Sequence, residues 1–443
     1  MSQLAIFGGP PQRTRPFPSW PAFDESEEQA LLEVLRSGNW WHYSQGEAVE
    51  PKKPEGGQPR SKVAEFQEAF ARFQGAKYGM ACANGSVAIE VALKALGVGP
   101  GDEVIVPCYT FVATASAVLM VNAIPIFVDI EPETFNIAPH RVEEAITART
   151  KALIPVHFAG QAADMDSLLS IAERHNLVMV EDAAHAHGAT WKGKGLGCIG
   201  HAGTFSFQAS KNMTAGEGGL ITTNDRDLAE LCESYIWGGR EVGRPWYEYH
   251  RLGWNYRLTE FQGAILLQQL KRVEAQNAKR DENARYLDKH LSKLPGISPL
   301  GVREDVTQHS HHLYIFRFHE EEFGISRSQF LEALNAEGVS GLSGYADPLY
   351  KNPLFLHQDF YPRGCPITCG HYGRALDYAA FEALCPNAER ACREAVWLEH
   401  RQLLAEREDM DDIVHAIEKI YEHRQDFRSP DPARTASAGL TVA

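Results

Sequence analysis

Lys211 stands in a setting that suggests a chemical role. The stretch 203–225 reads GTFSFQASKNMTAGEGGLITTND, in which Ser206 precedes the lysine and several glycines follow it. Small neighbours leave room for a flat ring, and glycines let another group approach the backbone closely. A lysine amine placed in this way can attack an aldehyde and can afterwards carry a proton. The alternative is an ordinary solvated lysine.

Two acidic residues end a neighbouring apolar run. VMVEDAAHAHG places Glu181 and Asp182 at the end of a strand expected over 177–182. Ligands of open α/β sheets bind at the carboxyl ends of the strands, where a carboxylate can pair with a protonated ring nitrogen. A buried acid that caps a helix is the alternative. His185 and His187 follow at a spacing that allows a metal pair, although this pattern is more often structural.

A phosphate site and an aromatic residue complete the set. ANGSVAIEVALKAL opens a helix at Gly85 and Ser86, whose N–H and hydroxyl groups can hold a phosphate, although most such starts are simply caps. PCYTFVATA places Tyr109 and Phe111 after the strand 103–107, where a ring can stack or pack in the core. Phosphate site, aromatic, carboxylate and lysine together are what pyridoxal phosphate requires. We therefore predict that this chain binds pyridoxal phosphate.

Alternating helices and short apolar strands position these residues. Apolar strands separated by helices indicate an α/β fold whose mostly parallel sheet is buried on both faces. Helical spacing of apolar residues predicts further helices at 62–73, 85–96 and 258–292. The predicted strands are 103–107, 124–130, 152–158, 177–182, 204–207 and 219–223.

Composition changes along the chain divide it into four parts. The predicted parts are an N-terminal arm with a surface insertion (1–60), a large cofactor-binding domain (61–275), a smaller C-terminal α+β domain (276–425) and a disordered tail (426–443). The insertion 43–60 is rich in glycine, proline and charge, which is typical of a long surface loop.

Charge and hydropathy exclude several classes of partner. The 443 residues include 43 basic and 58 acidic ones, a formal net charge of −15, which argues against nucleic acid or an anionic membrane as the main partner. No apolar run is long enough to span a bilayer, and the N-terminus lacks the pattern of a secretory signal. We expect a cytoplasmic protein.

Two patterns look like metal or nucleotide sites but fit them poorly. Cys365 and Cys369, with His371 and Cys385 nearby, raise a zinc site, but the paired C-x2-C spacing is missing and reduced thiols are favoured. We therefore predict no metal. GLGCIG at 195–200 matches G-x-G-x-x-G, yet a strand rather than a helix follows it, so we predict a turn between two strands and no NAD site.

The block VEDAAHAHGATWKGKGLGCIGHAGTFSFQASKNMTAGEGGLITTND resembles the signature of the DegT/DnrJ/EryC1/StrS aminotransferases, and LGWNYRLTEFQGA resembles a second motif of that family. These are fold-type-I pyridoxal phosphate enzymes that aminate keto-sugars, cyclitols and related rings. The resemblance covers most of the chain. It implies a large domain with a mostly parallel, seven-stranded-type sheet, a smaller C-terminal domain, and a cytoplasmic enzyme whose two small-molecule substrates are an amino donor and a keto acceptor.

The resemblance also assigns roles to single residues. It implies that Lys211 carries the cofactor as an internal aldimine and acts as the proton-transfer base, and that Asp182 pairs with the pyridine nitrogen. Asn255 would reach the cofactor phosphate of a neighbouring subunit, which implies a homodimer with shared active sites. The other implied cofactor contacts are Ser86 and Ser206 with the backbone around Gly85 and Val87 at the phosphate, Phe111 stacked on the ring, and His185 near the ring hydroxyl.

The acceptor is suggested by two departures from the nucleotide-sugar enzymes. GNWWHYSQG, before the long insertion, and CPNAERACREAVWLEHRQLL look closer to 3-amino-5-hydroxybenzoate synthase and the scyllo-inosose aminotransferases. This resemblance implies a cyclitol or other unactivated ring as acceptor and glutamate or glutamine as amino donor. The candidate residues of the substrate pocket are Trp40, Trp41, His312, Tyr314, His400 and Arg401.

Three other functions are compatible with parts of this pattern. An aromatising enzyme like 3-amino-5-hydroxybenzoate synthase would use the same residues. A non-enzymatic, pyridoxal phosphate-binding regulator would need a DNA-binding segment or basic patch, and neither accompanies the domain. Dehydratases of the family that remove the hydroxyl at carbon 3 replace the lysine with histidine, so Lys211 argues against them.

Overall fold

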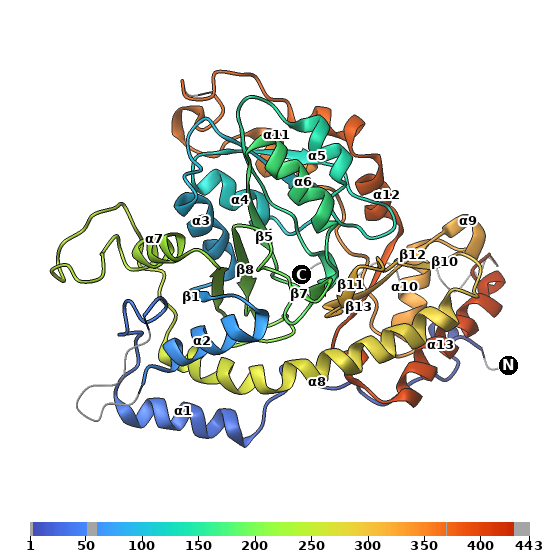
Figure 1. Cartoon of the computed structure of the whole chain (residues 1–443). Coiled ribbons are helices and arrows are strands. Elements are labelled where there is room, and N and C mark those ends of the chain that lie inside the picture. The colour runs from blue at the N-terminus through green and yellow to red at the C-terminus, as the bar shows by residue number, and fades with distance from the viewer. Residues whose placement is uncertain (1–2, 51–59, 369, 429–443) are drawn as a thin grey trace.

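A seven-stranded sheet forms the centre of the larger part of the molecule (Figure 1). The computed structural model describes residues 3–50, 60–368 and 370–428. The strand order is β1-β9-β8-β5-β4-β2-β3, and every pair is parallel except the two that β9 makes. The strands are β1 (Tyr78–Cys82), β2 (Glu103–Pro107), β3 (Ile124–Val128), β4 (Thr150–Leu153), β5 (Val178–Asp182), β8 (Ala202–Ser206) and β9 (Gly219–Thr223). This is the mostly parallel α/β sheet that the apolar strands predict.

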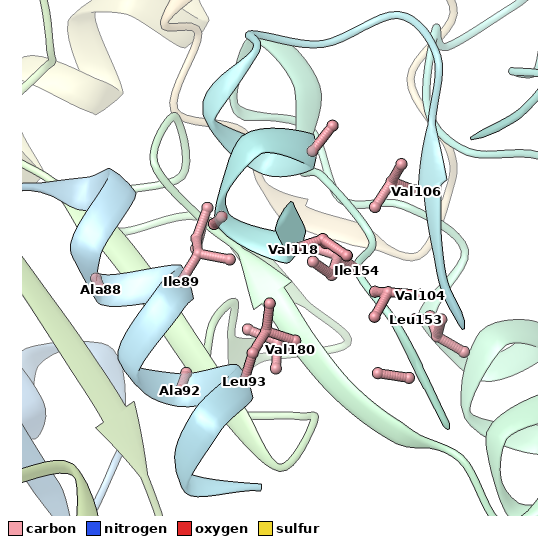
Figure 2. Packing of buried hydrophobic residues seen from close by; sticks show 14 of the residues in the cluster. Ala88, Ile89, Ala92, Leu93, Val104, Val106, Val118, Leu153, Ile154 and Val180 are labelled. Atoms are coloured by element: carbon pink, nitrogen blue, oxygen red, sulfur yellow. The ribbon is translucent and has the colours of Figure 1, made fainter. Parts of the chain in front are cut away.

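The sheet is buried because helices cover it on both sides. All five residues of β2 and all five of β3 are buried, as expected for strands inside a layered fold. Figure 2 shows how α3 (Gly85–Ala95) packs: Ile89 and Leu93 lie in the same apolar cluster as Val104 of β2 and Val180 of β5. The other helices of this part are α2 (Lys62–Gln74), α4 (Ala113–Met120), α5 (Pro139–Ala145), α6 (Met165–His175) and α7 (Arg226–Ile236).

A long helix, α8 (Glu260–Leu291), links the two parts of the chain and runs along one side of the molecule in Figure 1. Its first turns pack on α2 and on α1 (Glu25–Ser37), and its last turns enter a second apolar cluster. The predicted boundary at 275/276 falls inside this helix and stays a prediction. Of the predicted surface insertion, residues 51–59 lie outside the described residues, as do residues 429–443 of the predicted tail.

The second cluster is built on a three-stranded antiparallel sheet, β10-β12-β13, with helices packed against it. Leu4 and its neighbours from the N-terminal segment pack into the same cluster. Its elements are β10 (Ile297–Pro299), β12 (Leu313–Phe318), β13 (Ala395–Glu399), α9 (Glu320–Phe323), α10 (Arg327–Ala336) and α13 (Arg407–Glu422). The connection between α10 and β13, which carries α11 (Pro353–His357) and α12 (Pro386–Glu394), instead packs on the large sheet beside β3.

One predicted strand is shorter in the structure, and one strand of the structure was not predicted. The predicted strand 152–158 ends at Leu153, and β1 was not expected at all. β1 is an edge strand that follows soon after α2. Its short sequence YGMAC has no β-branched residue, and strand prediction depends on such residues. The third sheet, β11-β6-β7, has only two- and three-residue strands at β6 (Thr190–Trp191), β7 (Lys194–Gly195) and β11 (Val306–Gln308).

A buried ion pair joins the N-terminal segment to the small domain, and it gives a stability prediction. Glu337 is fully buried and accepts hydrogen bonds from Lys419 Nζ at 2.8 Å and from the backbone N–H groups of Ala5 and Gln12. Glu337→Gln leaves the Lys419 charge without its partner, which costs about 3 kcal/mol for a buried pair. We expect a clearly lower midpoint of urea denaturation.

The control is Glu332→Gln, an exposed carboxylate on the same helix. It should change stability by no more than about 0.5 kcal/mol. Equal midpoints for the two variants would show that the buried pair does not stabilise the fold.

Candidate active site

Asp182 lies at the carboxyl end of β5 with its carboxylate nearly shielded from solvent. The residue is 6% exposed. One carboxylate oxygen accepts from Thr114 Oγ1 at 2.8 Å and the other from the Ala184 N–H at 3.2 Å. Burial raises the pKa of Asp182, while these two donors and the nearby Lys211 lower it. The carboxylate is therefore fixed in orientation at the sheet edge, where α/β folds bind ligands.

The neighbouring Glu181 points the other way and is occupied by the protein itself. Its carboxylate accepts from the backbone N–H groups of Gly197, Ile199 and Gly200 at 2.6–2.7 Å, and from His157 Nε2 at 2.9 Å. The GLGCIG segment is thus the turn that leads into β8, as predicted, and its N–H groups hold an internal carboxylate. Of the two candidate acids, only Asp182 faces the site.

Lys211 follows β8 in a segment without regular secondary structure. Burial lowers the pKa of Lys211 to about 8, against the opposing effect of the Asp182 carboxylate. A larger fraction of the amine is therefore neutral, and nucleophilic, near neutral pH than for an exposed lysine. Lys211 is therefore not an ordinary solvated lysine, which was the alternative.

The two histidines after Asp182 have different neighbours. His187 is fully buried among phenylalanines, and its Nε2 lies 2.9 Å from the carbonyl of Ser206. His185 packs against His312, with ring centroids 4.1 Å apart, and no partner for its Nδ1 is found among the described residues. Burial, and then the charge of Lys211, lower the pKa of His185 well below its usual value, so the ring is neutral.

The start of α3 meets the end of β8. A Cβ on Gly85 would lie 2.7 Å from the Cβ of Ser206, so only glycine lets the helix start approach this serine. Asn84 caps the helix by accepting from the Val87 N–H at 3.0 Å. Val87 is therefore already bonded within the protein, whereas no partner is found within the described residues for the Gly85 and Ser86 N–H groups. These two N–H groups and the Ser206 hydroxyl form an anion cradle at a helix N-terminus.

The loop after β2 separates its two aromatic residues. Tyr109 is 1% exposed and packs against Phe158 and Tyr345, whereas Phe111 is 57% exposed. Phe111 is thus the ring available for stacking, and Tyr109 belongs to the core. Tyr345, from the connection between α10 and β13, was not singled out from the sequence. Burial, and then the Asp182 charge, raise the pKa of Tyr345, so its hydroxyl lies within electrostatic range of that carboxylate. Its distance along the chain from every motif hid it.

The predicted substrate residues are dispersed. Tyr314 is buried in the small-domain cluster, and its hydroxyl donates to Asp288, so the structure does not bring it to the lysine. Arg401 pairs with Glu399 at 2.8 Å. His312 lies beside His185, and His400 lies beside Ser210, which precedes Lys211. Trp40 and Trp41 are about half exposed and lie instead beside Phe261 and Trp237 respectively.

A buried group outside this site also contains possible metal ligands. The thiols of Cys108 and Cys385 and a carboxylate oxygen of Asp129 all lie within 4.8 Å of one another. Both Asp129 oxygens already accept backbone N–H groups at the start of α12, from Asn387 and Ala388. The hydrogen bonds at the start of this helix account for the carboxylate without a metal. Cys369, part of the C-x3-C pattern, lies outside the described residues.

The residues at the sheet edge fit pyridoxal phosphate in each part of that molecule. The anion cradle at Gly85, Ser86 and Ser206 suits its phosphate, and Asp182 suits its ring nitrogen. Lys211 provides an amine for its aldehyde, and the unpaired Nδ1 of His185 is a polar atom that needs a partner. The Gly85 contact with Ser206 matters most here, because a side chain at Gly85 would fill the cradle.

Comparison with known proteins agrees with this geometry. Residues 56–382 match the DegT/DnrJ/EryC1/StrS aminotransferase family. The chain belongs to that family. It is an aminotransferase, and enzymes of the family depend on pyridoxal phosphate.

Individual relatives match over nearly their whole length. A putative L-glutamine:3-amino-2,3-dideoxy-scyllo-inosose aminotransferase of Streptoalloteichus tenebrarius is 41% identical over 428 residues, which are 95% of this chain and 98% of that protein. An L-glutamine:2-deoxy-scyllo-inosose aminotransferase of Streptomyces lividus is 37% identical over 441 residues, covering 96% and 99%. Among solved structures, 3-amino-5-hydroxybenzoic acid synthase superposes with a TM-score of 0.81 at 32% identity, covering 93% of this chain and 100% of that one.

The Gly85 contact gives a binding prediction for the aminotransferase. Gly85→Ala places a methyl group against Ser206 and displaces the serine from the cradle. We expect the affinity of the apoenzyme for pyridoxal phosphate to fall at least about tenfold, which is about 1.4 kcal/mol. Absorbance titration measures this. Gly99→Ala is the control, because a Cβ there meets nothing within 4 Å; equal affinities for the two variants would contradict the assignment of the cradle.

The lowered pKa of Lys211 gives a pH prediction. Only the neutral amine reacts with an aldehyde, so reductive methylation of Lys211 by formaldehyde in the apoenzyme should increase with pH and reach its midpoint at about 8. Asp182→Asn removes the carboxylate that raises this pKa, so its midpoint should lie at lower pH. Mass spectrometry of the Lys211 peptide measures both. A midpoint near the ordinary lysine value of 10.5, or an upward movement in Asp182→Asn, would contradict the buried environment.

Proposed function

We propose that this aminotransferase transfers the amino group of L-glutamine, or of glutamate, to the keto group of a cyclitol of the scyllo-inosose type. The relatives that match over nearly the whole chain carry names of this activity, which supports both the donor and the acceptor class. The observation that carries the chemistry is the placement of Lys211 within electrostatic range of a buried carboxylate, Asp182, at one edge of the sheet.

Each residue of the site has a defined task in this proposal. When bound, pyridoxal phosphate supplies an aldehyde that reacts with amines and a ring that withdraws electrons from the adjoining carbon. Lys211 Nζ would be the amine that holds the cofactor and, when free, would move the proton of the substrate carbon. Asp182 would keep a ring nitrogen protonated, and Phe111 would offer its exposed ring for stacking. Gly85, Ser86 and Ser206 would hold the phosphate.

The substrate pocket in this proposal is smaller than the sequence suggested. His312 is next to His185 and directs its Nε2 away from Asn212, to which its Nδ1 is bonded, so it is the predicted substrate residue best placed to meet a ring hydroxyl. Trp40 and Trp41 lie on the surface, and they would line a substrate pocket only where a second subunit covers them.

A homodimer is part of the proposal. Asn255 is exposed, in an antiparallel bridge with Trp237, where it can reach a neighbouring subunit as the family motif implies. Trp41 and Trp246, both exposed, pack against Trp237, the bridge partner of Asn255, and exposed aromatic residues are typical of interfaces between subunits. Trp40, Tyr247 and Tyr249 are exposed as well. No helix among the described residues is long and apolar enough to cross a membrane, and a cytoplasmic location stays a prediction.

The decisive experiment is a two-stage reaction with defined acceptors. Enzyme loaded with pyridoxal phosphate is first treated with L-glutamine or L-glutamate, and the donor is removed. scyllo-Inosose, 2-deoxy-scyllo-inosose or a nucleotide keto-sugar is then added, and the products are analysed by mass. We expect amination of the cyclitol ketones. In Lys211→Ala the rate of amination should fall at least about 10³-fold, and the visible absorbance of the cofactor should disappear.

Two outcomes would redirect the proposal. Amination of the nucleotide keto-sugar alone would place the acceptor in the sugar class. A product that has also lost water would favour the aromatising reaction of 3-amino-5-hydroxybenzoate synthase, which the structural similarity to that enzyme makes the second candidate. An unchanged visible spectrum in Lys211→Ala would overturn the role of the lysine.

A further inference from the structure

The backbone next to Lys211 is held by side chains that come from distant parts of the chain. Residues 208–211 lie outside regular secondary structure, and the Lys211 N–H donates to the Gln208 carbonyl within one turn at 2.9 Å. Trp20 Nε1 donates to the carbonyl of Ala209 at 3.0 Å, and His400 Nε2 lies 3.0 Å from the carbonyl of Ser210. Both carbonyls that precede the lysine are therefore bound from outside.

Arg280, behind His400, is buried in an unusual way. It is fully buried on α8, and among the described residues no carboxylate lies within ion-pair distance of it. Its guanidinium donates to Asn277 Oδ1 at 2.9 Å, and its Nη2 lies 3.1 Å from His400 Nδ1. The ring of Trp20 lies 5.6 Å from it. Burial lowers the pKa of Arg280 to about 9, so it is still charged at neutral pH.

A buried cation without a counter-charge destabilises a fold, so stability does not explain this arginine. Besides Asn277 and the ring of Trp20, Arg280 contacts one nitrogen of His400, whose other nitrogen contacts the lysine segment.

The arginine and the Ser210 carbonyl both favour the tautomer of His400 that carries its proton on Nε2. A guanidinium has only donors, so His400 Nδ1 must accept, and the ring proton must sit on Nε2. Nε2–H then donates to the Ser210 carbonyl. Burial, followed by the positive charges of Arg280, Arg401 and Lys211, lowers the pKa of His400 well below its usual value, while the Ser210 carbonyl opposes them. Its ring neighbour His312 is neutral as well.

We propose that Arg280 is a positioning residue for Lys211 that acts through His400. By fixing the Nε2–H tautomer, Arg280 keeps the Ser210 carbonyl bonded and so fixes the peptide that precedes the lysine. This role rests on the proposed function of Lys211. It also replaces the substrate role predicted for His400, because both ring nitrogens are engaged by the protein and the residue is only 4% exposed.

The matched pair His400→Gln and His400→Leu tests the bond to Ser210. A glutamine can accept from Arg280 through Oε1 and donate to Ser210 through Nε2, whereas leucine can do neither. The rate at which the apoenzyme captures pyridoxal phosphate covalently, trapped with borohydride, should fall about 10- to 100-fold in His400→Leu, as for a misplaced reacting group. It should stay within about threefold of the wild type in His400→Gln.

Arg280→Met tests whether the arginine works through the histidine. Alone it should slow capture about 3- to 10-fold, because His400 can then adopt either tautomer. In the double variant Arg280→Met/His400→Leu the capture rate should be no lower than in His400→Leu alone, since an effect transmitted through His400 is lost with it. Equal fold-losses in the two backgrounds would overturn the proposal, as would a His400→Gln variant as slow as His400→Leu.

The histidine tautomer gives a readout that does not depend on the reaction. In apoenzyme labelled with ¹⁵N-histidine, His400, assigned by its absence from His400→Gln, should show the proton on Nε2. In Arg280→Met it should show both tautomers. Arg280→Lys keeps a donor and a charge and should preserve the tautomer, which covers the case in which Arg280→Met does not fold. A wild-type His400 protonated on Nδ1 overturns the proposal, whereas failure of Lys211 to capture pyridoxal phosphate in the wild type overturns the proposed function instead.

Discussion

The site depends on one buried carboxylate, Asp182, in surroundings that are otherwise cationic or neutral. Lys211 lies near it, and the surrounding histidines have pKa values far below the ordinary range. Burial raises the pKa of Asp182, and the hydrogen bonds from Thr114 and the Ala184 N–H, with the charge of the lysine, oppose this shift. In the proposed function, this carboxylate at the sheet edge would pair with the protonated nitrogen of the cofactor ring.

The adjacent Glu181 shows why the position in the strand matters. Successive side chains of a strand point to opposite faces, so two neighbouring acids cannot both face one ligand. Glu181 is hydrogen-bonded on the other side by three backbone N–H groups and His157. The glycine-rich turn after β7 therefore does for a carboxylate what similar turns elsewhere do for a phosphate. The dinucleotide-like spacing of GLGCIG follows from this need for several N–H groups at one point.

Much of the sheet and the central part of the site could be predicted from the sequence, because both depend on local patterns. Five-residue apolar strands such as β2 can be predicted from their residue types. Lys211 could be found because it follows a strand in a block that contains several motifs. Side chains brought in from far along the chain were not predictable. Tyr345 lies in a connection without a motif, and Arg280 lies on a helix where arginine normally faces solvent. Tyr314 failed as a pocket residue because its strand, β12, turns it into the small-domain core.

The small domain thus contributes residues that hold the segment before Lys211. His400 follows β13, Arg280 lies in the half of α8 that reaches the second cluster, and Trp20 belongs to the N-terminal segment. Bonds from two of them meet the two carbonyls before Lys211, so the position of the lysine is set where the two parts of the chain touch. A movement of the small domain against the sheet would move these donors together with it. The reactivity of the lysine therefore depends on how the two domains are arranged. The C-terminal third contributes no strand to the large sheet, yet its packing affects the chemistry at the edge of that sheet.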